Sequence, residues 1–275
     1  MTAVALRAAT AALSAGDPVS AVALLAQAKP RLDAAAWRSR GLALQLRALS
    51  QLGRAAEAEE ILARDGGTLD AASRSGFARL VAWGWIRAGQ VDKAREALAG
   101  SGDEDDEVSA WLALYDGDLA RARKGLRRPA DATAEVVTAM ATLGRTKADS
   151  SRELGLAFLA LARLDSAQAA QRFERAADAL TDAAPLLLAL AARIHGARRQ
   201  DAVAVGLWRR IVAQFASAPE AAEADLEWAR TLRRRGDAGG AQERLEHLIL
   251  SYPQSALVPQ ARRELESVRT GASDT

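Results

Sequence analysis

One short pattern recurs along this chain of 275 residues: a glycine, a polar residue, three variable residues and an alanine. Two degenerate copies have another residue in place of the glycine. The seven copies begin at Gly16, Gly53, Gly89, Gly117, Leu164, Arg199 and Gly236, so they are 37, 36, 28, 47, 35 and 37 residues apart. A period of this length predicts similar supersecondary units stacked on their neighbours rather than one globular core.

Two more positions keep register with the start of each copy. A large apolar residue stands nine residues later: Leu25, Leu62, Leu98, Leu126, Phe173, Trp208 and Leu245. Seven residues earlier, six copies have alanine (Ala9, Ala82, Ala110, Ala157, Ala192 and Ala229), and Leu46 is the exception. Glycine suits the left-handed residue that ends a helix, and a polar residue then starts the next one. Small residues let two antiparallel helices approach closely.

This register resembles the tetratricopeptide repeat, a helix-turn-helix unit of about 34 residues. The family's aromatic consensus sites are mostly Ala and Leu here, so the copies are divergent. The resemblance implies an all-α, right-handed α-solenoid. We expect four helix pairs in an N-terminal block (1–127), then an extra helix near 132–144, three further pairs and a capping helix near 256–269 in a second block (128–269). A disordered tail (270–275) would follow.

The C-terminal part carries a narrower resemblance. The element Y-P-x-S-x-x-x-P-x-A-R, from Tyr252 to Arg262, is similar to repeats of bacterial cell-envelope proteins. These include the Tol-Pal periplasmic coordinator and the lipoprotein of the outer-membrane β-barrel assembly machine. The likeness covers about 206–268, and it implies a role in cell-envelope assembly or maintenance.

Composition excludes several function classes. The chain has no cysteine, which removes thiol chemistry and disulfides. The formal charge of +2 lacks the one-sided balance that nucleic-acid binding usually needs, so we expect no nucleic-acid partner. The longest apolar stretch, Ala183 to Ala192, is far shorter than the roughly 20 residues of a membrane span. The N-terminal residues lack a basic leader region and are expected to form the first repeat helix.

No pattern of catalytic or ligand-binding residues stands out. The chain lacks phosphate-binding glycine motifs, a nucleophile elbow and the H-E-x-x-H zinc motif. The two histidines, His195 and His247, lie in different repeats and are expected to have packing or surface roles. The acidic run 103–107 is interpreted as a helix N-terminus, and the arginine run 233–235 as a solvated helix end. We therefore expect no enzyme activity, cofactor or metal.

The most informative positions are those that line the concave face in this repeat family. They lie on the first helix of each pair, six and two residues before the turn glycine. We predict that they bind a partner with aromatic anchors in the middle and arginines at the ends, namely Trp83, Trp111, Tyr115, Phe158, Arg47, Arg87, Arg193, Arg230 and Arg234. Aromatic and arginine side chains dominate binding hot spots. The alternative for Trp83 and Trp111 is that they fill core gaps between divergent repeats.

Two functions follow. The first is a non-enzymatic scaffold that holds a peptide or protein with acidic flanks on the concave face. The second is a cytoplasmic regulatory repeat domain of a signalling or transcription system. The absence of a leader favours the second, whereas the element at 252–262 favours the first. The expected compartment is the cytoplasm for the chain as written, or the periplasm if a leader was removed.

Overall fold

The computed structural model describes residues 2–29, 40–99, 107–126 and 134–270. Within these ranges the regular elements are α-helices and one short 3-10 helix, with no strand. The predicted all-α class is therefore confirmed. Several expectations fall outside the described residues: the acidic positions 103–106, the loop at 127–131 and the tail at 271–275.

The chain divides into two compact units. Unit 1 comprises Met1–Ala113 with Ala162–Leu164, and unit 2 comprises Leu114–Leu161 with Asp165–Thr275. The division falls inside helix α8 (Glu107–Asp116). The boundary expected after residue 127 lies in a part that the structure does not describe.

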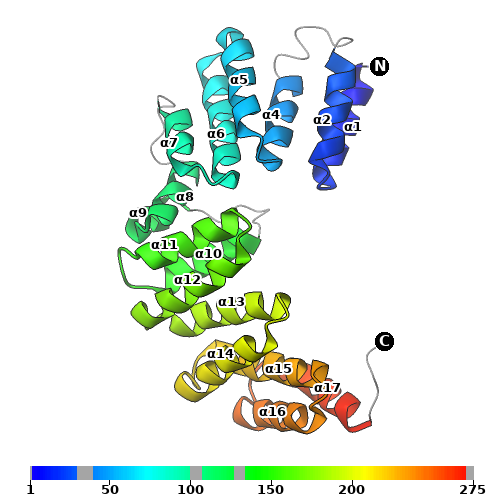
Figure 1. Ribbon diagram of the computed structural model, residues 1–275, viewed down its shortest axis with the longest axis vertical. Helices are drawn as coiled ribbons and strands as arrows, with labels where there is room; N and C mark the ends of the chain where they lie inside the picture. The colour runs from blue at the N-terminus through cyan, green and yellow to red at the C-terminus, as the bar shows by residue number, and fades with distance from the viewer. Residues whose placement is uncertain (1, 30–39, 100–106, 127–133, 271–275) are drawn as a thin grey trace. The chain divides into compact units, whose positions relative to one another are not determined.

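In its described residues, unit 1 contains three complete helix pairs. They are α1 (Thr2–Ser14) with α2 (Pro18–Ala28), α4 (Leu42–Gln51) with α5 (Ala55–Asp65), and α6 (Ala71–Arg87) with α7 (Val91–Leu98). The 3-10 helix η3 (Gly66–Thr68) follows α5. Each first helix contacts the first helix of the next pair: α1 packs on α4, and α4 packs on α6. Figure 1 shows this order from α1 to α7.

Unit 2 continues with α9 (Leu119–Gly125) and α10 (Ala134–Arg145). Three pairs follow: α11 (Arg152–Ala162) with α12 (Ser166–Ala179), α13 (Ala184–Ala197) with α14 (Asp201–Gln214), and α15 (Pro219–Arg234) with α16 (Ala238–Ser251). The last described helix is α17 (Val258–Thr270). From α12 to α17 every helix packs on the next, and α13 also contacts α15 (Figure 1). This is the packing of a helical repeat.

The helix α10 lies where the 47-residue spacing predicts an extra helix. It is tied to distant parts of unit 2 by polar contacts. Arg145, its last residue, donates a hydrogen bond of 2.9 Å to Glu220 of α15, whose side chain is buried. Arg123 of α9 donates to the carbonyl oxygens of Leu143 and Ala148 at 3.2 Å and 2.8 Å.

Each of the seven copies of the sequence pattern marks the turn between two paired helices. The glycine position has a positive φ in every copy: between +68° and +82° at the five glycines, +59° at Leu164 and +61° at Arg199. The amide of Gly53 donates to Ser50 O at 3.1 Å, and the next amide, from Arg54, donates to Leu49 O at 2.9 Å. This is the Schellman arrangement, which satisfies the last carbonyl groups of the first helix.

The polar residue after the turn starts the second helix. In four turns it is an aspartate whose carboxylate accepts a hydrogen bond from the amide three residues later: Asp17, Asp118, Asp165 and Asp237. Such a cap stabilises a helix by about 1 kcal/mol because it satisfies an amide that has no helical partner. The expected role of this position is confirmed in these copies.

The register positions form the core. The alanine five residues after each turn position is at most 1% exposed in all seven copies. The residue seven positions before each turn position is at most 3% exposed. These small side chains lie where the two helices of a pair approach each other. The large residue nine positions later is buried at Leu25, Leu126, Phe173, Trp208 and Leu245, and half-buried at Leu62 and Leu98.

Candidate functional site

The four aromatic residues predicted for the concave face have different environments. Trp83 is half-buried, and its ring lies edge-on to that of Trp111, with centroids 6.2 Å apart. Trp111 is 2% exposed, Tyr115 is 4% exposed and Phe158 is fully buried. Of the four, only Trp83 offers a partly accessible ring, so the structure supports the core alternative for Trp111 and places Tyr115 and Phe158 in the core as well.

The burial of Tyr115 and Phe158 has a local cause in unit 2. A Cβ on Gly155 would lie only 2.6 Å from Leu114 O and 2.8 Å from Tyr115 O, so α11 meets the end of α8 backbone to backbone. The backbone of Tyr115 is therefore part of this close approach. Phe158 packs edge-on against Phe173 of its own helix pair, with ring centroids 5.4 Å apart.

The arginines of unit 1 contribute less to a site. Arg47 is exposed on α4. Arg87 is the last residue of α6, and its side chain lies outside the described part of the structure. Among the predicted arginines, those that the structure brings together are Arg193, Arg230 and Arg234 of unit 2.

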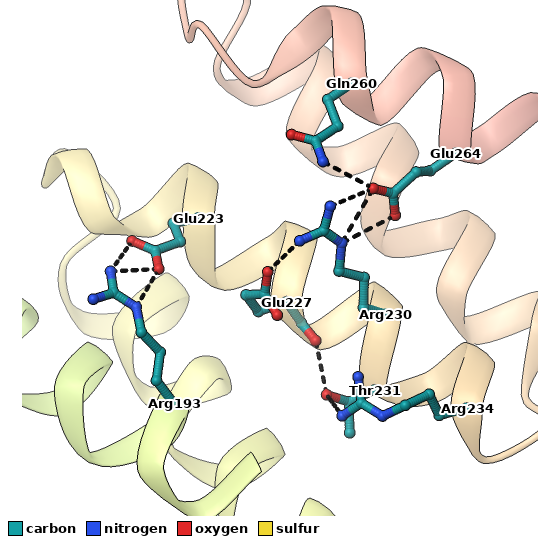
Figure 2. A network of polar contacts seen from close by, with 8 residues as sticks. All are labelled: Arg193, Glu223, Glu227, Arg230, Thr231, Arg234, Gln260 and Glu264. Atoms are coloured by element: carbon teal, nitrogen blue, oxygen red, sulfur yellow. Dashed lines mark hydrogen bonds and ion pairs between the residues drawn. The ribbon is translucent and has the colours of Figure 1, made fainter. Parts of the chain in front are cut away.

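Arg193, Arg230 and Arg234 lie on neighbouring first helices, α13 and α15, as Figure 2 shows. We call these three residues the arginine face. Arg193 donates two hydrogen bonds of 2.6 Å to the two carboxylate oxygens of Glu223 on α15. This bidentate contact joins α13 to α15 and orients the guanidinium plane.

Arg230 continues the same connection from α15 to α17. Its Nη2 donates to Glu264 of α17 at 2.6 Å, and its Nη1 donates to Glu227 at 2.5 Å. Gln260 donates a further hydrogen bond of 3.3 Å to Glu264 (Figure 2). The hydrogen bond with Glu264 is the main reason why the pKa of Arg230 is raised above its ordinary value, with Glu227 acting in the same direction.

Arg234 is held more loosely, one helical turn further along α15. Its Nη2 lies 3.2 Å from Asp201 of α14 and donates to Thr231 at 3.0 Å. The side chain is 37% exposed, compared with 30% for Arg230. Carboxylates of neighbouring helices thus fix the three guanidinium groups while leaving each of them in contact with solvent.

Two open pockets flank this face. The first, about 390 Å³, lies between α15 and α17 and is lined by Arg230, Arg233, Arg234, Gln260, Arg263 and Glu264. The second, about 490 Å³, lies between α13 and α15 and includes Arg193, Arg199 and Arg234 beside Glu223 and Glu227. The first pocket has four guanidinium groups and one carboxylate among its lining residues. Such a lining attracts anions, and arginine pairs well with planar carboxylates.

The partners of the arginine face were not among the residues predicted from the sequence. Arg230 and Glu264 are 34 residues apart, and Arg193 and Glu223 are 30 apart, so each ion pair spans about one repeat. Opposite charges separated by one repeat were the signal that could have found them. The buried Asp225, which lies against His247, was not among the predicted residues either.

The described residues contain no group of side chains suited to hold a metal ion, and no helix among them is long and apolar enough to cross a membrane. Comparison of the chain with protein-family models, curated proteins and solved structures finds no match.

Proposed function

We propose that this protein is a non-enzymatic scaffold that binds an acidic segment of a partner protein on the arginine face of α13 and α15 and in the pocket toward α17. The observation that carries the proposal is the lining of that pocket, where four arginines face one glutamate. Charged groups arranged in this way steer an oppositely charged partner and fix its orientation.

The network of Figure 2 supports a binding role because it holds the arginines in place before a ligand arrives. A side chain that is already oriented loses less conformational entropy on binding. Glu223, Glu227 and Glu264 occupy some of the donor groups, whereas Arg263 has no hydrogen bond or ion pair within the described residues. We infer that an acidic ligand would contact Arg263 and the remaining donors of Arg230 and Arg234.

Membership of the tetratricopeptide repeat family is part of the proposal. It is supported by the seven left-handed turns and by the buried small residues in register with them. A role at the cell envelope is supported by the resemblance of the segment from Tyr252 to Arg262 to repeats of cell-envelope proteins. The alternative is that the same face binds a partner in the cytoplasm in a regulatory role.

The test is a binding titration with labelled peptides. The probe is a fluorescent peptide with alternating glutamate and leucine, and its counterpart has lysine in place of glutamate. We expect the acidic peptide to bind and the basic one not to bind. Changing Arg263→Gln should weaken binding about two- to fivefold, the range of a partly exposed charge pair.

The chain offers a matched control on the same helix. Arg262 is exposed but does not line the pocket, so Arg262→Gln removes the same charge elsewhere. Equal losses from the two changes would mean that binding is nonspecific attraction by net charge. Equal binding of the acidic and basic peptides would contradict the proposed ligand class.

A further inference from the structure

The pocket between α13 and α15 has an apolar part that the binding of acidic residues does not explain. Ala192, Gly196 and Ala197 of α13 line it, together with Trp208 of α14. In the pocket between α15 and α17, by contrast, the lining residues within the described part of the chain are all charged or polar. The two pockets are therefore suited to different parts of a ligand.

The apolar part has room for a side chain. Ala192 and Trp208 are 0% and 2% exposed, so they form the base of the pocket, whereas Gly196 is half-buried and Ala197 is exposed nearer its mouth. A Cβ built on Gly196 would meet no atom within 4 Å, so this position faces open space. The pocket volume of about 490 Å³ lies within the range of roughly 300–1,000 Å³ found for small-ligand sites. An apolar side chain of leucine size can therefore enter it.

The charges around this pocket are nearly balanced. Its lining includes the guanidinium groups of Arg193, Arg199 and Arg234 beside the carboxylates of Glu223 and Glu227. The pocket between α15 and α17 has four guanidinium groups and one carboxylate. Like charges brought together oppose binding, so the carboxylates of a ligand favour the side of α17. An uncharged part of the same ligand can lie over α13 without meeting this repulsion.

We propose that the pocket between α13 and α15 binds an apolar side chain of the same partner segment whose acidic residues bind between α15 and α17. This inference rests on the proposed function and makes its ligand more specific. The axes of packed helices lie about 8–10 Å apart, which sets the spacing of the two pockets. An extended polyproline-like segment places residues three positions apart on the same side, roughly 9 Å from each other. The partner therefore carries its apolar residue about three positions from its acidic residues.

The first experiment compares two peptides on the unchanged protein. The labelled peptide L-S-S-E-E-S-S-L has leucine on both sides of a glutamate pair, so that it can bind in either direction, and its counterpart has alanine in place of both leucines. Fluorescence anisotropy measures the two dissociation constants. We expect the alanine peptide to bind about tenfold more weakly, because it buries less apolar surface.

The outcomes of this comparison separate the inference from the function on which it rests. Equal affinities of the leucine and alanine peptides would overturn the apolar site and leave the binding of acidic segments in place. If neither peptide binds, the proposed function and the apolar site are both contradicted.

The second experiment fills the pocket from the protein side. Gly196→Leu places a side chain in open space, so we expect the fold to persist. This change should weaken binding of the leucine peptide about tenfold and alter binding of the alanine peptide by no more than about twofold. If this variant does not fold, Gly196→Ala adds a single methyl group and should weaken the leucine peptide about two- to threefold.

A matched control is Gly206→Leu. Gly206 is a half-buried glycine inside α14 with the same open space around it, and it does not line the pocket. We expect this variant to bind both peptides as the unchanged protein does. An equal loss for the two peptides in the Gly196 variants, or the same loss of the leucine peptide in Gly206→Leu, would overturn the proposal.

Discussion

Leu164 and Arg199 share a left-handed backbone conformation, with φ values of +59° and +61°, at the turn position that glycine occupies in the other five copies. A side chain at such a φ brings Cβ close to the following carbonyl oxygen and costs about 1–2 kcal/mol. The repeat therefore imposes the same turn on its degenerate copies, and the helices that pack on either side supply the free energy for it.

Replacing either residue with glycine should relieve this strain. We expect Leu164→Gly and Arg199→Gly each to raise the free energy of unfolding by about 0.5–1 kcal/mol, after the greater entropy of unfolded glycine is subtracted. Leu164 is 91% exposed, so its removal loses little packing. Urea unfolding measures the change. Arg198→Gly is the control: this neighbour has φ of −85°, so glycine there should destabilise the protein. A loss of stability in both glycine variants would contradict the strain.

Gly155 is predicted to be intolerant of alanine. Its Cβ would lie 2.6 Å from Leu114 O and 2.7 Å from Gly117 N, which are backbone atoms that cannot swing away. We expect Gly155→Ala to lower the free energy of unfolding by about 1–3 kcal/mol through overpacking. Gly206→Ala, inside α14 with open space around it, should instead stabilise by up to about 1 kcal/mol. Similar thermal midpoints for the two variants would show that α8 and α11 do not pack this closely.

The ion pair between Arg230 and Glu264 should join α15 to α17 energetically. A double-mutant cycle with Arg230→Gln and Glu264→Gln should give a coupling of about 1 kcal/mol, because the side chains are only 30% and 17% exposed. The pair of Arg54 and Glu57, whose side chains are 46% and 49% exposed, should give about 0.3 kcal/mol. Equal couplings for the two pairs, measured by urea unfolding in low salt, would exclude a structural role for the network.

The tryptophans in contact, Trp83 and Trp111, should respond differently to truncation. Trp111→Ala removes a side chain that is 2% exposed and should cost about 3–5 kcal/mol of stability. Trp83 is half-buried, so Trp83→Ala should cost clearly less and leave the fold intact. Thermal unfolding followed by circular dichroism checks both. A larger loss from Trp83→Ala would reverse the assignment of core and surface within this pair.

Much of the fold follows from local sequence rules. The turn positions, the paired helices, α10 and α17 were predictable because glycine, capping aspartates and the periodic small residues act within a few positions of the backbone they shape. Gly53 ends one helix, and Ala58 marks the buried side of the next. The solenoid's hand stays a prediction from the resemblance.

Only some of the positions predicted to line the site are exposed in the structure. Positions six and two residues before each turn lie on one face of the first helix, and Arg193 and Arg234 at such positions are exposed in the structure. The same rule failed for Tyr115 and Phe158, because the exposure of a helix face depends on how closely the next helix approaches. For Tyr115 that approach involves Gly155 of the next repeat, through backbone contacts that no local pattern encodes.

The sequence by itself therefore determined where the turns between paired helices lie and which positions near them are small and buried, since turn and capping preferences are local. Only the tertiary structure decided which side chains meet across repeats. It paired Arg230 with Glu264, covered Tyr115 and Phe158, and buried Asp225 against His247. The two polar contacts join residues 34 and 22 positions apart, and their free energies depend on burial and distance, which arise only when the helices stack.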